Sequence, residues 1–115
     1  MKKVLLIDDE EMIIETTSEM LEILGFEVQS AYNGNDGLIK LDAYQPDFLI
    51  LDCHLPDITP EEIISSILKK HSNIKIIISS GVRINDFGND EMNQAIYGFL
   101  NKPFDLNTLE KILKE

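Results

Sequence analysis

Three carboxylates stand directly after short apolar runs, and their type and spacing suit metal and phosphoryl chemistry. Asp8 and Asp9 follow the apolar run at residues 4–7, and Asp52 follows the run at residues 48–51. Carboxylates that cluster repel one another and raise each other's pKa unless a cation joins them. Oxygen ligands without cysteine or histidine nitrogen select a hard ion. We therefore expect a site for Mg²⁺, with Mn²⁺ as an alternative.

Hydroxyl and ammonium groups follow two further apolar runs. Ser79 and Ser80 come after residues 74–78, and Lys102 comes after residues 97–101. A lysine and a hydroxyl that face the carboxylates would clamp a phosphoryl group. A central carboxylate, here Asp52, can itself act as the nucleophile and form an aspartyl phosphate. The simpler alternatives are that Asp8 and Asp9 only cap a helix and that Lys102 is a solvated surface residue.

The elements that must position these side chains alternate regularly between strand and helix. Strands are predicted at residues 3–7, 27–31, 48–52, 74–78 and 97–101. Helices are predicted at residues 11–24, from a cap at Asn35 to about Tyr44, from Pro60 to residue 70, at 85–94 and after Asp105. Thr59 and Asp105 are the expected caps of the third and fifth helices, and the buried stripe of the third helix is expected to consist of Ile63, Ile64, Ile67 and Leu68. The fourth helix has few apolar anchors, so we expect it to be irregular and locally disordered.

The alternation predicts one α/β domain over residues 1–115, with a parallel sheet covered by helices on both faces. Five units suit an open, doubly wound sheet, and the most apolar strands are the first, third and fourth. This favours the flavodoxin-like strand order 2-1-3-4-5 with five helices. The carboxyl ends of parallel strands meet at one edge of a sheet. The carboxylates, the serines and the lysine are therefore expected at the same edge.

Composition limits the classes of partner. The formal net charge of −11 argues against direct binding to nucleic acid or to an anionic membrane surface. No apolar run approaches the roughly 20 residues that span a bilayer. Cys53 is the single cysteine, so no internal disulfide can form, and we expect a buried thiol and a cytoplasmic protein.

The motifs taken together resemble the response-regulator receiver domains of two-component signalling, chemotaxis receivers among them. The resemblance covers the whole chain and rests on the order and spacing of four pieces: residues 7–10 (IDDE), 51–56 (LDCHLP), 80–81 (SG) and 98–104 (GFLNKPF). It implies a signalling module that catalyses its own phosphorylation and slow dephosphorylation, rather than a turnover enzyme.

The resemblance assigns the acidic residues their roles. Asp52 is implied to be the phosphoacceptor, which takes a phosphoryl group from a phosphohistidine. Asp9 and Asp52 are implied to bind Mg²⁺ directly, Asp8 through water, and His54 through its backbone carbonyl. The implied partner is a sensor histidine kinase or a histidine phosphotransfer protein, with an output domain or target protein and phosphorylation-dependent homodimerisation left open.

The same resemblance implies a switch. Lys102 pairs with the phosphoryl oxygens, the hydroxyl of Ser80 moves inward, and Phe99 fills the space that it leaves. This changes the surface of the fourth helix, fifth strand and fifth helix. Ser79 is one position early, so its side chain is expected on the opposite face of the sheet. Phe99 is equally well explained as an ordinary core residue. Lys102-Pro103 resembles the family's cis peptide.

Two residues depart from the family's usual pattern. Pro60 stands where the family usually has glycine, and we expect it to stiffen the start of the third helix. His54 lies two residues after Asp52, and we hypothesise that its side chain influences the dephosphorylation rate or its pH dependence.

Three other functions remain as alternatives. The first is a degenerate receiver that acts as a constitutive protein-interaction module. The second is a flavodoxin-like cofactor binder, which would need a phosphate-binding loop after the first strand. The third is an aspartate-nucleophile phosphatase, which would need an Asp-x-Asp pair there. The carboxylates at residues 8 and 9 fit neither of the last two.

Overall fold

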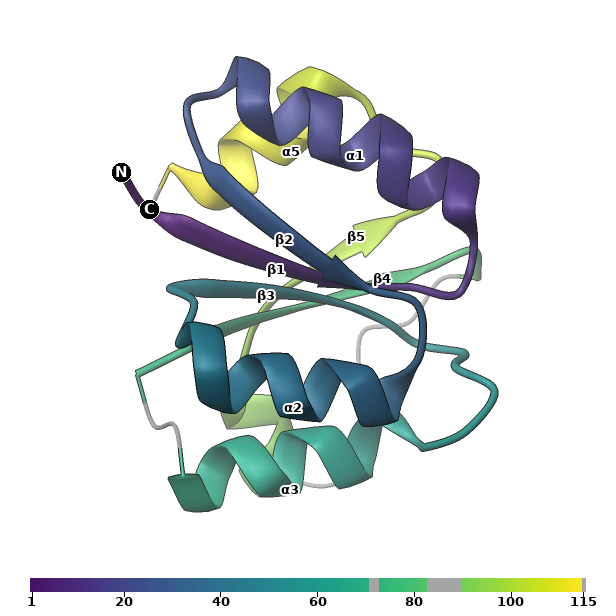
Figure 1. Cartoon of the computed structure of the whole chain (residues 1–115), viewed down its shortest axis with the longest axis vertical. Coiled ribbons are helices and arrows are strands. Elements are labelled where there is room, and N and C mark those ends of the chain that lie inside the picture. Colours follow the sequence, from purple (N-terminus) through teal and green to yellow (C-terminus); the bar gives the residue numbers. More distant parts are fainter. Residues whose placement is uncertain (71–72, 83–89, 115) are drawn as a thin grey trace.

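Five parallel strands lie between two layers of helices in the computed structural model, which describes residues 1–70, 73–82 and 90–114 (Figure 1). The elements are, in chain order, β1 (Lys3–Ile7), α1 (Glu11–Ile23), β2 (Glu27–Ala31), α2 (Gly34–Tyr44), β3 (Phe48–Asp52), α3 (Pro60–Lys70), β4 (Lys75–Ser80), α4 (Asp90–Ala95), β5 (Ile96–Asn101) and α5 (Leu106–Leu113). The strand order is β2-β1-β3-β4-β5, as the sequence predicts.

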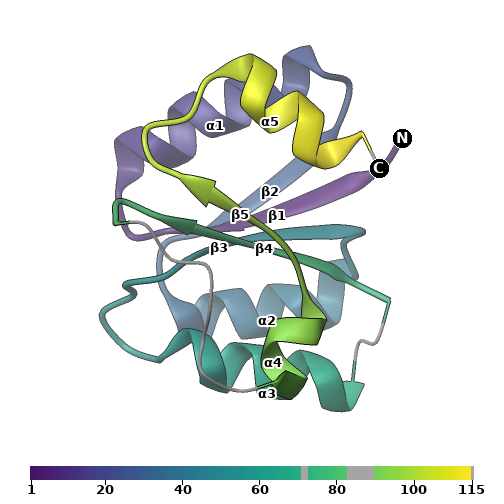
Figure 2. The ribbon, with the colours of Figure 1, turned by 180° about the vertical axis from the view of Figure 1, so that it is seen from behind.

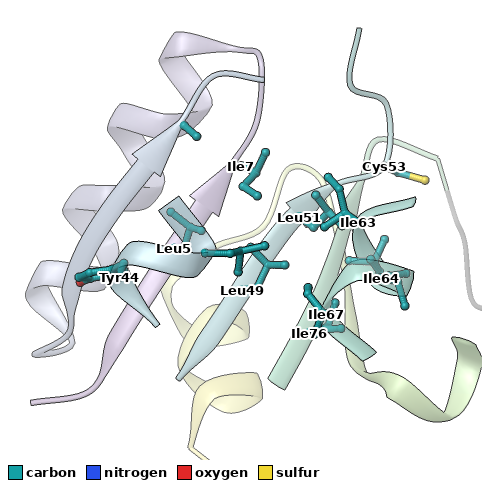
Figure 3. Packing of buried hydrophobic residues seen from close by; sticks show 13 residues of the cluster. Leu5, Ile7, Tyr44, Leu49, Leu51, Cys53, Ile63, Ile64, Ile67 and Ile76 are labelled. Atoms are coloured by element: carbon teal, nitrogen blue, oxygen red, sulfur yellow. The ribbon is translucent and has the colours of Figure 1, made fainter. Parts of the chain in front are cut away.

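Each face of the sheet has its own hydrophobic core. α1 and α5 cover one face, and α2, α3 and α4 cover the other (Figures 1 and 2). Successive side chains of a strand point to opposite faces. In β3, Leu49 and Leu51 accordingly pack beneath α2 and α3 (Figure 3), whereas Phe48 and Ile50 pack beneath α1 and α5. Every residue of β3 is buried, because the strand lies between β1 and β4.

Two of the three predicted helix caps are confirmed. Thr59 Oγ1 accepts a hydrogen bond from the Glu62 backbone N–H at 3.2 Å, and Asp105 Oδ1 accepts one from Thr108 N–H at 2.8 Å. α3 begins at Pro60, a residue that suits the first helical position.

The predicted cap of α2 at Asn35 is wrong. Asn33 is the cap, and its Oδ1 accepts from Asp36 N–H at 2.8 Å. The helix therefore begins at Gly34. Both asparagines suit the cap by type. The choice between them depends on where the preceding chain leaves β2, which local sequence does not specify.

Three smaller expectations are also corrected. β4 continues through Ser79 and Ser80, because these residues pair with β3 and β5 rather than forming a turn. Leu68 is 39% exposed and does not belong to the buried stripe of α3, since it lies farther round the helix than Ile63, Ile64 and Ile67. The start of β5 at Ile96 differs from the prediction by one residue.

The predicted fourth helix at residues 85–94 is only partly described. Its residues 85–89 lie outside the described residues, so the expectation of local disorder there stays a prediction. α4 from Asp90 to Ala95 has no fully buried residue, in line with its few apolar anchors. None of the described helices has the length and apolar character needed to cross a bilayer.

Candidate functional site at the carboxyl ends of the strands

The carboxyl ends of β1 and β3 bring three aspartates together. Asp52 is the last residue of β3, and Asp8 directly follows β1, whose pairing continues through a 3.1 Å hydrogen bond from Asp8 N–H to the carbonyl of Ala31. Asp9, next in the chain, is exposed. Carboxylate oxygens of Asp8, Asp9 and Asp52 lie within 4.8 Å of one another. Asp52, more than 40 positions from Asp8 and Asp9 in sequence, thus joins them in the cluster predicted from the strand ends.

The donor set of this cluster fits magnesium. All three groups are carboxylates, the ligand type that hard cations prefer. Asp8 and Asp52 are each 5% exposed, whereas Asp9 faces solvent, so the cluster is open on one side. Mg²⁺ commonly takes one or two carboxylates and keeps several waters, which requires such an open side.

Lys102 lies within the acidic cluster. Its Nζ donates to Asp8 Oδ2 at 2.7 Å and to Asp52 Oδ1 at 3.1 Å, and its side chain is 11% exposed. The carboxylate of Glu10 is a more distant, exposed neighbour at 3.9 Å. Lys102 follows β5, where its own N–H donates to the Ser80 carbonyl, and the Lys102-Pro103 peptide is cis, as the resemblance implies. Lys102 is therefore not an ordinary solvated lysine.

The cluster of three aspartates and Lys102 has a negative net charge. Burial raises the pKa of Asp52, and repulsion from Asp8 raises it further, while Lys102 and the backbone N–H of His54 act in the opposite direction. Burial lowers the pKa of Lys102, but its hydrogen bonds to Asp8 and Asp52 outweigh this effect, and the net pKa is raised. Three carboxylates less one ammonium leave two negative charges, which equals the charge of one divalent cation.

Asp8 also helps to order the start of α1. Its Oδ1 accepts the N–H of Glu10 at 2.9 Å, while its Oδ2 accepts from Lys102. Glu10 occupies the cap position of α1 and makes no side-chain cap hydrogen bond. Neither Asp8 nor Asp9 is therefore the cap of α1, and the simple capping alternative does not account for the cluster.

The two serines at the end of β4 lie on opposite faces of the sheet. Ser79 pairs in register with Asp52 and lines, with Asp8 and Thr17, a cavity of about 10 Å³ on the α1 side. Ser80 lies an even number of residues after Ile76 and Ile78 in β4, so its side chain points to the same face as theirs. Ile76 and Ile78 belong to the core beneath α2 and α3. Ser80 Oγ accepts the N–H of Val82 at 3.1 Å. The alternation predicted for this pair is confirmed.

Phe99 is half-buried and packs against the same core that includes Ile76 and Ile78. It pairs in register with Ile78, two residues before Ser80. Ser80 and Phe99, the two residues of the implied switch, therefore belong to the same side of the sheet, the side covered by α4.

Comparison with known proteins identifies the family. The sequence model of the response regulator receiver domain matches residues 4–114. The chain belongs to this family. Among solved structures, this receiver domain superposes on the CheY-like receiver domain of Methylobacillus flagellatus with a TM-score of 0.88, at 28% identity over 99% of this chain and 97% of that one. The response regulator TrrA of Thermotoga maritima, solved in complex with Mg²⁺ and BeF, gives a TM-score of 0.86 at 32% identity, with the same two coverages.

Curated relatives are longer than this receiver domain. The transcriptional regulatory protein CrdR of Helicobacter pylori is 30% identical over 98% of this chain, and the match spans 54% of CrdR. The sensor kinase CckA of Brucella abortus is 29% identical over 97% of this chain, but the match spans only 12% of that kinase. The chain thus spans about half, or much less, of the length of these relatives.

The loop after β3 contains His54, one of the two departures, and one residue that sequence reasoning missed, while the other departure, Pro60, is the first residue of α3. His54 is exposed, and Cys53 is buried in the core (Figure 3), where burial raises the pKa of its thiol. The missed residue is Asp57. It accepts the backbone N–H groups of Gly34 and Asn35 at 2.8 and 2.9 Å. No local signal marks it, because its partners lie more than 20 positions away in sequence.

Proposed function

We propose that this receiver domain accepts a phosphoryl group on Asp52 from a phosphohistidine of a sensor kinase or a phosphotransfer protein. The observation that carries the proposal is the position of Lys102, whose ammonium bridges the carboxylates of Asp8 and Asp52. A buried carboxylate, a second carboxylate for a metal and a cation within hydrogen-bonding distance together make a site for phosphoryl transfer.

The chain's own residues account for the transfer step. A carboxylate oxygen of Asp52 attacks phosphorus, the bond from phosphorus to the histidine nitrogen breaks, and the leaving imidazole takes up a proton. The ammonium of Lys102 donates to the phosphoryl oxygens, and burial keeps water away from Asp52. Asp9, Asp52 and the His54 carbonyl would hold Mg²⁺, with Asp8 acting through water, and the ion would supply positive charge to the phosphoryl oxygens.

Phosphorylation then changes the surface formed by α4, β5 and α5. The hydroxyl of Ser80, which accepts from Val82 N–H in this structure, turns to donate to a phosphoryl oxygen. Phe99 fills the space that Ser80 leaves. Two features support a movable surface: α4 has no fully buried residue, and Phe99 is only half-buried. The switch is a local charge change that biases a surface with two arrangements.

The wider assignment follows from the family and the charge. We propose that residues 1–115 form one receiver module of a two-component or phosphorelay system, acting in the cytoplasm. Its output is a linked domain or a separate target protein, with homodimerisation on phosphorylation as one route. It catalyses its own phosphorylation and slow dephosphorylation. The net charge of −11 speaks against direct contact with nucleic acid or an anionic membrane.

The test is intact mass after treatment with acetyl phosphate, with and without Mg²⁺. We expect wild type to gain one phosphoryl group only with Mg²⁺, and Asp52→Ala to gain none. Asp47→Ala is the matched control, since Asp47 is an exposed carboxylate just before β3, at the opposite end of the strand that ends with Asp52. No gain in wild type under any condition would contradict the proposal and favour the degenerate receiver, a constitutive interaction module.

A further inference from the structure

The loop between β3 and α3 is attached to the first turn of α2 by a single carboxylate. Asp57 Oδ1 accepts the N–H of Gly34 at 2.8 Å, and Oδ2 accepts the N–H of Asn35 at 2.9 Å. The first N–H groups of a helix have no partner within the helix and need outside acceptors. Asp57 supplies two of these acceptors, and Asn33 supplies the next, for Asp36 N–H. We call the contact between Asp57 and the residues Gly34 and Asn35 the loop clasp.

Packing shows that the clasp is a close contact. A Cβ atom at Gly34 would lie 2.1 Å from Ile58 Cγ2 and 3.2 Å from Asp57 Oδ1, so only glycine leaves room for the loop here. Ile58 itself packs against the core beneath α2 and α3. The hydrogen bonds from Gly34 and Asn35 also hold the pKa of Asp57 below its ordinary value, which keeps the carboxylate charged.

The loop that is held in this way continues directly from the phosphoacceptor. Cys53 and His54 follow Asp52, and the backbone N–H of His54 acts to lower the pKa of the Asp52 carboxylate. Residues 53–60 and Asp9 line one open groove of about 490 Å³ beside the acidic cluster. His54, Pro56 and Asp57 are exposed, so core packing holds this loop only through the partly buried side chains of Leu55 and Ile58.

We propose that Asp57 is a positioning residue for the metal site: the loop clasp holds residues 53–57 so that the backbone of His54 faces the cation. The inference rests on the proposed function, since it concerns the ligands of that same site. Groups that orient metal ligands without touching the metal often change metal affinity by about 10–100-fold when they are removed. Because coupling between two binding events is reciprocal, a clasp that raises the affinity for Mg²⁺ must itself be strengthened when Mg²⁺ binds.

A role limited to helix capping makes a different prediction. Under that role, removal of Asp57 lowers the stability of α2 and leaves the Mg²⁺ affinity of the folded protein unchanged. The positioning role instead requires that Mg²⁺ affinity and the hydrogen bonds at Gly34 and Asn35 depend on one another. The two roles are therefore separated by metal affinity and by amide resonances, neither of which requires phosphorylation.

The experiment is a Mg²⁺ titration of the folded protein, followed through its backbone amide resonances. We expect Asp57→Ala to weaken Mg²⁺ binding about tenfold. Asp57→Asn keeps one acceptor and should lie between that variant and wild type. Asp36→Asn is the matched control, because it also removes one negative charge beside the first turn of α2 but leaves the clasp intact. The Mg²⁺ affinity of Asp36→Asn should lie within about twofold of the wild-type affinity.

The resonances of Gly34 and Asn35 supply a second readout. In wild type they should shift as Mg²⁺ binds, and in Asp57→Ala they should not respond. Mg²⁺ affinity of Asp57→Ala and Asp57→Asn within twofold of wild type would overturn the inference, as would unresponsive Gly34 and Asn35 amides in wild type. If Asp57→Ala fails to fold, the Mg²⁺ affinity of Asp57→Asn and the response of the wild-type Gly34 and Asn35 amides to Mg²⁺ still test the inference. Absence of any Mg²⁺ binding by wild type would overturn the proposed function, and this inference with it.

Discussion

Lys102 donates to Asp8 at 2.7 Å, a shorter hydrogen bond than the one of 3.1 Å that it makes to Asp52, the proposed phosphoacceptor. Lys102 and Asp8 are 94 positions apart in sequence. Because its side chain is 11% exposed, Lys102 neutralises part of a buried negative charge. A metal ion that binds these carboxylates must share them with this ammonium.

The first prediction concerns Lys102→Met. Removal of one partner from a buried ion pair typically costs about 3–5 kcal/mol, because a charge is left unpaired. We expect the metal-free variant to lose about 3 kcal/mol of unfolding free energy, at the low end because the carboxylates can take up a proton. Mg²⁺ should restore most of this loss. Chemical denaturation in EDTA and in Mg²⁺ measures both effects.

Lys114→Met is the control for this measurement. Lys114 is 73% exposed and lies 3.9 Å from Glu110 one helical turn away. Such exposed pairs contribute about 0.3–0.5 kcal/mol. Equal losses in the two variants would show that Lys102 does not neutralise a buried charge.

The second prediction concerns the close packing of α2 on β1. A Cβ atom at Gly37 would lie 2.4 Å from Ile7 Cδ1 and 2.9 Å from Ile7 Cγ1. Overpacking of a core costs about 1–3 kcal/mol, while the helix propensity of alanine returns about 1 kcal/mol. We expect Gly37→Ala to lose about 1 kcal/mol in thermal or chemical unfolding. Ala43→Gly, on the exposed face of the same helix, should lose a similar amount through propensity alone.

The double variant Gly37→Ala with Ile7→Val separates packing from propensity. It removes one methyl group from the side chain that meets the new Cβ. We expect the cost of Gly37→Ala to fall in this background, because the two residues are in contact. An unchanged cost would contradict the packing explanation.

The third prediction is a pH dependence of stability that arises from Tyr44. This residue is 8% exposed, and its hydroxyl has no hydrogen-bond partner among the described residues. Burial raises the pKa of Tyr44 to about 12, and the nearby Glu27 carboxylate acts in the same direction. The folded state thus favours the neutral phenol. Its contribution is fully present below the unfolded pKa of about 10 and is lost as the pH rises from 10 through 12.

The measurement is the difference in unfolding free energy between wild type and Tyr44→Phe across pH 8 to 12. Wild type should lose about 2 kcal/mol more than the variant over this range. The contribution of the lysines, which titrate in the same pH range, is the same in both proteins and cancels in this difference. Tyr32→Phe, at a residue that is 48% exposed, should behave as wild type. Parallel curves for wild type and Tyr44→Phe would contradict this assignment.

The fourth prediction concerns His54. Its exposed side chain belongs to the groove that adjoins Asp9, two residues after Asp52. We expect His54→Asn to change the decay rate of the phosphorylated protein about two- to fivefold and to flatten the dependence of that rate on pH. Decay of the radiolabelled phosphoprotein with time measures the rate. An identical rate at every pH would exclude a role for this side chain.

Much of the fold follows from local pattern. The apolar runs predict the strands, and strand alternation places Ser79 and Ser80 on opposite faces. Thr59 and Asp105 are confirmed as caps because each bonds an N–H only three residues along the chain. The apolar character of the first, third and fourth strands predicts the strand order, and the order and spacing of the motifs predict the family. Parallel strands bring their ends to one edge whatever the details of packing.

The features that sequence missed involve segments remote from one another. Asn33 rather than Asn35 caps α2, and the Asn35 N–H in the first turn of the helix donates to Asp57 of another loop. β4 extends through Ser79 and Ser80 because strands on either side offer partners.

The sequence by itself determined which chemical groups stand at the ends of the strands, because strand alternation and end residues are local properties. Only the tertiary structure decided how those groups share their hydrogen bonds: that Lys102 bonds Asp8 as well as Asp52, and that Asp57 bonds α2. These contacts depend on differences of about a few tenths of an ångström in the distances between elements. Such distances are set by the packing of both cores together and by no short stretch of sequence.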